Sequence, residues 1–86
     1  MRTVYKYPLI VHEEQELMLP KGAQILSVAN QNDSLVLYAL VDAEKTEREA
    51  YTIYIRGTGH PMYHLGVFIG TVSMFGGKLM LHVFVG

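Results

Sequence analysis

The sequence has no cysteine and no tryptophan, and only three of its 86 residues are proline. Without cysteine the chain can form neither disulfide bonds nor thiolate metal sites, so its folding needs no oxidising compartment. No stretch approaches the roughly 18 apolar residues of a membrane-spanning helix. Residues 1–6 lack the apolar segment of a signal peptide. We therefore expect a cytoplasmic protein with no membrane association.

The chain also lacks an excess of charge of either sign. Seven Lys and Arg residues stand against eight Asp and Glu residues, for a net charge of −1. A nucleic-acid-binding domain normally carries a basic excess on one face, so we expect no nucleic-acid partner. Half of the residues are apolar, which excludes an intrinsically disordered chain. The length predicts a single domain over residues 1–86.

Apolar residues recur mostly at every second position, which is the pattern of β-strands. The sequence predicts seven strands, at residues 3–7, 16–19, 24–31, 34–41, 49–56, 66–75 and 78–85, and a weak additional strand at 10–12. Residues 42–50 are polar and have no apolar stripe, so they are expected to form a loop or one helical turn. The pattern indicates an all-β fold: a small antiparallel sandwich or open barrel of six to seven strands, with little or no helix.

Turn signals separate the predicted strands. Asn32-Asp33 and Gly76-Gly77 are pairs that tolerate positive φ, and each predicts a two-residue β-hairpin turn. Pro20-Lys21-Gly22 combines a proline that presets φ with a glycine that accepts the left-handed region. The acidic segment around Glu14 and Glu16 is expected to be a solvated sheet edge that discourages aggregation.

Two predicted strands, at residues 35–41 and 79–85, are apolar on both faces. A chain of this length buries only roughly 60–65% of its unfolded surface, so one face of such strands either is covered or forms an interface. We expect a protein partner and a homo-oligomer, with a dimer favoured. The alternative is that these side chains fill the core of a sandwich and the rim of a barrel. The candidate interface residues are Val36, Tyr38, Tyr63, Met80, His82 and Phe84.

The segment from Arg56 to Pro61 is the most pointed local feature of the sequence. Its glycines free the backbone, and a guanidinium, a hydroxyl and an imidazole follow one another closely. Glycine-rich turns can direct N–H groups at an anion, and arginine can clamp a phosphate or carboxylate. The candidate ligand-binding residues are Arg56, Thr58, Gly59 and His60. The alternative is a turn whose glycines serve only the backbone; the spacing is not that of a dinucleotide-binding loop.

Metal binding and catalysis find little support in the sequence. His60 and His64 are four residues apart, but Pro61 lies between them and no carboxylate is near in sequence, so we predict no metal site and no cofactor. The serines have no nucleophile-elbow motif around them, and nucleophilic catalysis needs a base and an orienting acid. We predict no catalytic residues and no enzymatic activity.

Several segments, in this order, carry a family resemblance: residues 5–9 (YKYPL), 19–28 (LPKGAQILSV), 57–61 (GTGHP), 76–77 (GG) and 82–84 (HVF). The set resembles a family of short proteins, with no established activity, that is common in bacteriophages and prophages. The resemblance implies a phage or prophage accessory protein that acts by binding a protein partner, such as a host defence or regulatory factor that it inhibits. Two alternatives stay open: a protein that sequesters a small, anionic, nucleotide-like ligand, and a minor structural component of the virion.

Overall fold

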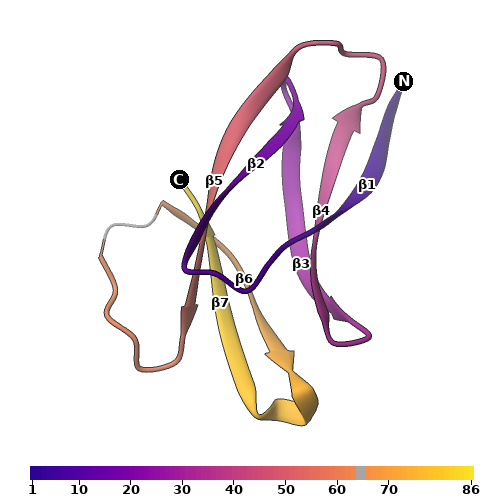
Figure 1. Ribbon diagram of the computed structural model, residues 1–86. Coiled ribbons are helices and arrows are strands. Elements are labelled where there is room, and N and C mark those ends of the chain that lie inside the picture. Colours follow the sequence, from indigo (N-terminus) through magenta and orange to yellow (C-terminus); the bar gives the residue numbers. More distant parts are fainter. Residues whose placement is uncertain (64–65) are drawn as a thin grey trace.

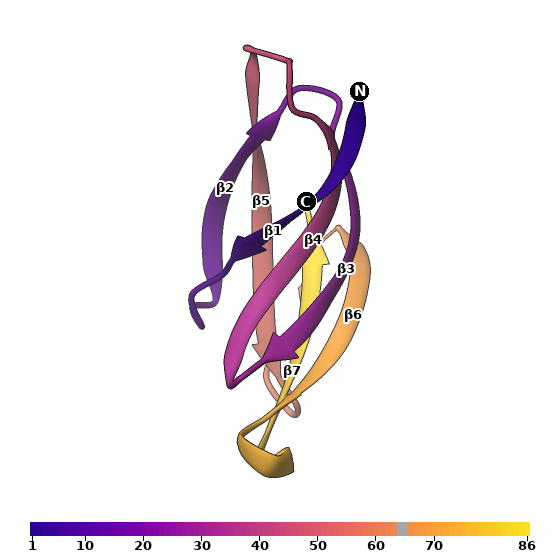
Figure 2. The ribbon, with the colours of Figure 1, turned by 90° about the vertical axis from the view of Figure 1, so that its right-hand side faces the viewer.

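A computed structural model describes residues 1–63 and 66–86, and these form two antiparallel sheets packed face to face. The three-stranded sheet has the order β1-β4-β3 and the four-stranded sheet the order β2-β5-β7-β6. The sheets lie side by side in Figure 1, and the three-stranded sheet faces the viewer in Figure 2. The strands are β1 (Arg2–Pro8), β2 (Glu14–Pro20), β3 (Gln24–Gln31), β4 (Ser34–Asp42), β5 (Arg48–Gly57), β6 (Val67–Met74) and β7 (Leu79–Val85). The prediction of a small all-β sandwich is confirmed.

The inward-facing positions of both sheets form one core, because successive side chains of a strand point to opposite faces. Leu37, Val41, Ile53, Met74 and Val83 are completely buried, and they come from β4, β5, β6 and β7. None of the described polar or charged residues is buried. The alternation seen in the sequence therefore separates the core from the outer faces.

The β3–β4 hairpin has the predicted two-residue turn. Asn32 and Asp33 have φ values of 53° and 61°, and Gln31 lies opposite Ser34. The Asn30 side chain supports the turn, since its Oδ1 accepts a hydrogen bond of 2.8 Å from the Asp33 N–H. A short polar side chain at this place can bond the backbone locally, which is why such residues accept positive φ.

The β6–β7 hairpin is longer than predicted. Met74 lies opposite Leu79, so four residues rather than two connect the strands. The connection contains a 3₁₀ turn, η1 (Phe75–Gly77), which is the one helical element of the part of the chain that the structure describes. Phe75 itself has a φ of 53°, so the positive-φ segment begins one residue before the glycine pair.

The segment predicted as a weak strand at residues 10–12 is a loop, and that prediction is wrong. The Gln15 side chain takes up the backbone of Ile10, accepting a hydrogen bond from its N–H (3.1 Å) and donating one to its carbonyl oxygen (2.6 Å). Because both the N–H and the carbonyl oxygen of Ile10 bond this side chain, they are not available for hydrogen bonds to a neighbouring strand. Of residues 42–50, which were predicted to form a loop or one helical turn, residues 43–47 form a loop, whereas residue 42 belongs to β4 and residues 48–50 belong to β5.

The sandwich is closed along one side and open along the other. On the closed side the Asn30 side chain of β3 donates to the carbonyl oxygen of Ser73 in β6 (2.9 Å). Gly70 lets the two strands approach, because a Cβ at this position would lie 3.2 Å from Val28 Cγ2. On the open side, β1 and β2 are the edge strands of their sheets.

Val36 is buried although it points to the outer face of the three-stranded sheet, where it is only 3% exposed. Lys6 Nζ in β1 donates a hydrogen bond of 2.6 Å to Gln31 Oε1 in β3. Lys6 lies opposite Tyr38 and Gln31 lies opposite Ser34, so this bridge crosses the central strand above Val36. The expectation that Val36 offers a contact surface is therefore wrong.

Candidate functional site

A cleft opens on the outer face of the four-stranded sheet, between strands β6 and β7 and the segment that follows β5. It has a volume of about 320 Å³ and is lined by Gly57, Thr58, Gly59, His60, Met62, Phe68, Thr71, His82 and Phe84. In Figure 1 the segment after β5 swings out on the side of this sheet that faces away from the three-stranded sheet. The cleft unites most of the predicted ligand-binding loop with two predicted interface residues.

His82 lies in the floor of the cleft, held on both ring nitrogens. Its Nε2 lies 2.8 Å from the Thr58 hydroxyl and its Nδ1 lies 2.9 Å from the Thr71 hydroxyl. Thr71 is the cross-strand partner of His82 in the β6–β7 ladder, whereas Thr58 comes from the segment after β5. A hydroxyl both donates and accepts, so each threonine can complement whichever role its ring nitrogen takes. These bonds fix the ring plane and fasten the segment onto the sheet.

An aromatic pair lines another part of the cleft. Phe68 and Phe84 lie opposite each other in the β6–β7 ladder. Their ring centroids are 5.4 Å apart and the rings are inclined by 57°, which is a favourable arrangement for aromatic rings. Phe84 is partly buried, whereas Phe68 is 55% exposed. The pair therefore offers an apolar surface to an incoming group.

His60 closes the turn after β5. Its backbone N–H donates to the Gly57 carbonyl oxygen (3.1 Å), and its Nδ1 accepts a hydrogen bond from the Gly57 N–H (3.2 Å). The ring lies so close to the backbone that a Cβ at residue 57 would be 2.9 Å from His60 Cε1. His60 also lines a second cavity, of about 190 Å³, together with Ile55 and Leu81. Only glycine at position 57 leaves the imidazole where it is.

Arg56, predicted as part of the ligand site, is not among the residues that line the cleft, although it lies opposite His82 in the β5–β7 ladder. Its Nη1 donates to the carbonyl oxygens of Glu13 (2.7 Å) and Ile55 (3.0 Å). The guanidinium thus ties the segment before β2 to β5, next to the ladder bond from the Ile55 N–H to the Glu13 carbonyl oxygen. None of the described residues that line the cleft is a lysine or an arginine.

The predicted interface residues divide between the two sheets. Tyr38 is partly buried on the three-stranded sheet, beside the buried Val36. Met80 is 38% exposed on the outer face of the four-stranded sheet, in the same strand as His82. Tyr63 follows the cleft segment and is 77% exposed. One outer face therefore carries Met80, His82 and Phe84, and the other carries Tyr38.

The histidine pair that was considered for metal binding consists of His60 and His64, and His64 lies outside the described residues. Within residues 1–63 and 66–86, no group of three or more histidine, aspartate or glutamate side chains is arranged to hold a metal ion. No helix in these same ranges is long and apolar enough to cross a membrane.

Sequence reasoning missed three residues that line the cleft: Met62, Phe68 and Thr71. Two of them could have been found from strand pairing, because Thr71 and Phe68 lie opposite His82 and Phe84 in the hairpin. The bulge between Phe68 and Gly70 changes the register there, and no feature of the sequence marks it. Met62 lies in irregular chain and gives no periodic signal.

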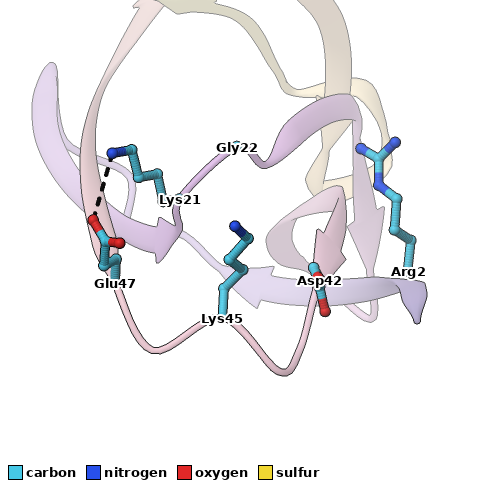
Figure 3. Close-up of a pocket in the computed structure, with 6 residues that line it drawn as sticks. All are labelled: Arg2, Lys21, Gly22, Asp42, Lys45 and Glu47. Atoms are coloured by element: carbon cyan, nitrogen blue, oxygen red, sulfur yellow. Dashed lines mark hydrogen bonds and ion pairs between the residues drawn. The ribbon is translucent and has the colours of Figure 1, made fainter.

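A second cleft, of about 440 Å³, lies at the other end of the sandwich and is lined by Arg2, Lys21, Gly22, Asp42, Lys45 and Glu47. Figure 3 shows Lys21 turned towards Glu47, with which it forms an ion pair of 3.4 Å, and the Lys45 ammonium directed towards Gly22. The side chains of this pair are 58% and 71% exposed. An exposed ion pair of this kind contributes little to stability. Because only the first cleft contains predicted site residues, we place the candidate site there.

Fold and site together define a small antiparallel β-sandwich protein with a largely uncharged cleft on one outer face. The whole chain, residues 1–86, matches a family model described as Domain of unknown function (DUF7352), and the chain belongs to this family. Comparisons with curated proteins and with solved structures found no significant match.

Proposed function

We propose that this chain is a non-catalytic binding protein that contacts a protein partner through the outer face of its four-stranded sheet. The observation that carries the proposal is a set of exposed apolar side chains on this side of the molecule. Met62 and Phe68, which are 54% and 55% exposed, line the cleft, and Met80, two residues before His82 in β7, is 38% exposed. Several large apolar side chains that stay exposed on one face of a folded protein are typical of an interaction site. Aromatic residues and methionine are also enriched at protein interfaces.

The composition of the cleft favours a protein partner over a small anionic ligand. The Arg56 guanidinium donates to main-chain carbonyls. Among the described residues that line the cleft, the basic side chains are the two histidines His60 and His82. A phosphate or carboxylate would find hydroxyl and imidazole groups there but no lysine or arginine, on which anion binding usually depends.

The cleft also offers poor support for catalysis. Both nitrogens of His82 contact threonine hydroxyls, and the Nδ1 of His60 is taken up by a backbone N–H. A histidine that activates a hydroxyl also needs an acid that orients it, and none of the described residues that line the cleft is an aspartate or a glutamate. The resemblance of the sequence motifs to short phage and prophage proteins supports a partner in the cytoplasm of an infected bacterial cell, such as a host defence or regulatory factor that the chain inhibits.

The test compares affinity capture from lysates of phage-infected bacteria by four versions of the chain. Wild type and Leu26→Ser, whose altered residue is 43% exposed on β3 of the other sheet, should retain the same partner. Phe68→Ser and Met80→Ser should weaken the captured complex by about tenfold or more, as truncation of a central interface residue does. Thermal unfolding verifies that all four are folded. Equal capture by all four, or loss only in Leu26→Ser, would contradict the proposal.

A further inference from the structure

We propose that the open side of the sandwich is an interface between two copies of this chain, in which strand β1 of each copy pairs antiparallel with strand β2 of the other. Both strands lie at sheet edges and are seven residues long. Neither has a second neighbouring strand among the described residues. An edge strand of this kind presents unpaired N–H and C=O groups and is a ready template for another strand.

The ladder bonds identify which backbone groups face the open side. The Leu9 N–H donates to the Leu35 carbonyl oxygen (2.9 Å), and this bond continues the register of β1 with β4. Bonding alternates along an antiparallel pair, so the odd-numbered residues of β1 bond to β4. The N–H and C=O groups of Arg2, Val4 and Lys6 therefore point outward.

Strand β2 follows the same rule. The Glu13 carbonyl oxygen accepts from the Ile55 N–H (3.0 Å), and the Lys21 N–H donates to the Glu47 carbonyl oxygen (2.9 Å). Both bonds continue the register of β2 with β5, so the odd-numbered residues bond inward. The outward groups belong to Glu14, Glu16 and Met18. Pro8 and Pro20, which have no N–H to donate, end the two strands.

The side chains of the two edges are complementary. When residues 2–8 overlap residues 14–20 along their whole length in antiparallel order, Lys6 lies opposite Glu16 and Val4 lies opposite Met18. Within one copy the exposed Lys6 ammonium donates to Gln31, and in the dimer it exchanges this amide oxygen for the Glu16 carboxylate of the other copy. Val4 is 51% exposed and Met18 is 52% exposed, and both lie on the outer faces of their sheets with the charged pair. Opposite charges and apolar pairs facing each other across strands are stabilising.

Pairing between identical edges lacks this complementarity. Two β1 strands centred on Val4 would set Lys6 opposite Arg2, and two β2 strands centred on Glu16 would set that carboxylate against its own copy. Like charges directly opposite each other destabilise a strand pair. The charges therefore favour β1 against β2, with the second copy of the chain as the occupant.

Symmetry requires the same register. Residues 9–13 join the two edge strands, so the end of β1 at Pro8 and the start of β2 at Glu14 lie at the same end of the sandwich. A twofold axis that runs along the open side, midway between the two sheets and parallel to the strands, brings each β1 beside the other copy's β2. Rotation about this axis does not shift either copy along the strand direction. Pro8 then lies opposite Glu14, which is the register that also pairs Lys6 with Glu16. Both contacts form together and close the dimer.

Cysteine cross-linking tests the pairing directly, because the chain has no cysteine of its own. Opposed residues that exchange backbone hydrogen bonds have Cα atoms about 5.5 Å apart, which suits a disulfide. The double variant Val4→Cys/Met18→Cys should become a covalent dimer on mild oxidation, whereas Val4→Cys alone should stay monomeric on a non-reducing gel. These two positions lie on opposite outer faces of one copy, so they cannot bond to each other. A monomeric double variant after oxidation would overturn the proposal.

Charge reversal with rescue provides a second readout by light scattering. The unmodified chain should be a dimer, and Glu16→Lys or Lys6→Glu should raise its dissociation constant about tenfold, since each introduces two like-charge contacts into the symmetric dimer. The double variant Lys6→Glu/Glu16→Lys should restore the dimer, and Lys78→Glu, in the β6–β7 connection, should leave it unchanged. A monomeric unmodified chain, or a dimer that none of these changes affects, would overturn the proposal. Strands β2 and β6 are opposite edges of one sheet, so the dimer interface at β2 lies away from the cleft beside β6. The test of dimer formation and the test of partner capture can therefore give different outcomes.

Discussion

His82 is the residue on which the shape of the cleft most depends, because its ring joins the sheet to the segment after β5. The two threonine hydroxyls that hold it come from different parts of the chain, at distances of 2.8 and 2.9 Å. A ring that is fixed on both nitrogens has one orientation instead of several. The part of the cleft formed by His82 and Phe84 therefore offers a partner one arrangement of side chains.

Replacing Thr71 tests this role of His82. The substitution Thr71→Val keeps the shape of the side chain but removes the hydroxyl that contacts His82 Nδ1. Loss of one such hydrogen bond should lower the free energy of unfolding by about 1 kcal/mol, measured by urea denaturation. Thr52→Val is the matched control, because the described hydrogen bonds do not include the Thr52 hydroxyl. Equal effects of the two substitutions would argue against a structural role for the threonine–histidine contact.

Gly66 and Gly22 offer a second test at single residues. Both have positive φ, 88° and 82°, but a Cβ on Gly66 would lie 2.1 Å from the Val85 carbonyl oxygen whereas a Cβ on Gly22 would meet nothing within 4 Å. Gly22→Ala should therefore cost only the backbone strain, about 1–2 kcal/mol. Gly66→Ala should cost clearly more, because backbone atoms must move. Chemical denaturation of the two variants measures the difference, and equal losses would contradict the close approach.

Individual residues were also where sequence reasoning was least reliable. Thr58, Gly59 and His60 were predicted as a group and do line one cleft. Arg56 was predicted with them and lies opposite His82 in the β5–β7 ladder, but its long side chain turns to the carbonyl oxygens of Glu13 and Ile55 instead. The burial of Val36 depends on a hydrogen bond between Lys6 and Gln31, which are 25 residues apart. No local pattern reveals such a contact.

At the scale of elements, most strands and turns were predictable because their signals are local. Alternating apolar residues and the Asn32-Asp33 pair specify the β3–β4 hairpin without help from the rest of the chain. The segment 10–12 has a strand-like composition, but the Gln15 side chain occupies its backbone. Which strands of the two sheets lie next to each other depends on long-range packing, and the sequence pattern did not indicate the strand order.

Tyr51 of β5 links two elements and makes stability depend on pH. Its hydroxyl lies 2.8 Å from a Glu49 carboxylate oxygen and 3.1 Å from the carbonyl oxygen of Ala23, the residue before β3. Burial, and then the hydrogen bond and negative charge of Glu49, raise the pKa of Tyr51 above its ordinary value of 10.0. At a pH between 10.0 and the higher pKa of the folded state, the folded chain keeps the Tyr51 proton and the unfolded chain loses it. The contribution of Tyr51 to the free energy of unfolding is therefore fully present below pH 10 and is lost as the pH rises through the pKa of the folded state.

The substitution Tyr51→Phe should remove this contribution. Thermal unfolding followed from pH 9 to about pH 11 should show a shallower loss of stability in the variant than in the unmodified chain. Below pH 9 the variant should be less stable by about 1 kcal/mol, because it lacks the hydroxyl proton that the Glu49 carboxylate and the Ala23 carbonyl oxygen share. A steeper loss of stability in the variant would show that the sign is wrong.

At the scale of the whole molecule, the sandwich offers two different surfaces to other molecules. The open side carries two edge strands with complementary charges, and the outer face of the four-stranded sheet carries the cleft and its exposed apolar side chains. The outer face of the three-stranded sheet is partly covered by the Lys6–Gln31 bridge. The surplus of apolar residues in the composition was a correct sign of exposed apolar surface, but only the fold shows on which face it lies.

Hydrogen–deuterium exchange of the chain, alone and bound to the captured partner, tests the central claim most directly. Amide protection on binding reports which face the partner covers. We predict that it increases in residues 57–62, 67–71 and 80–84, which surround the cleft, and stays unchanged in β3, whose outer face belongs to the other sheet. Increased protection confined to β3 and β4, with none around the cleft, would contradict the account.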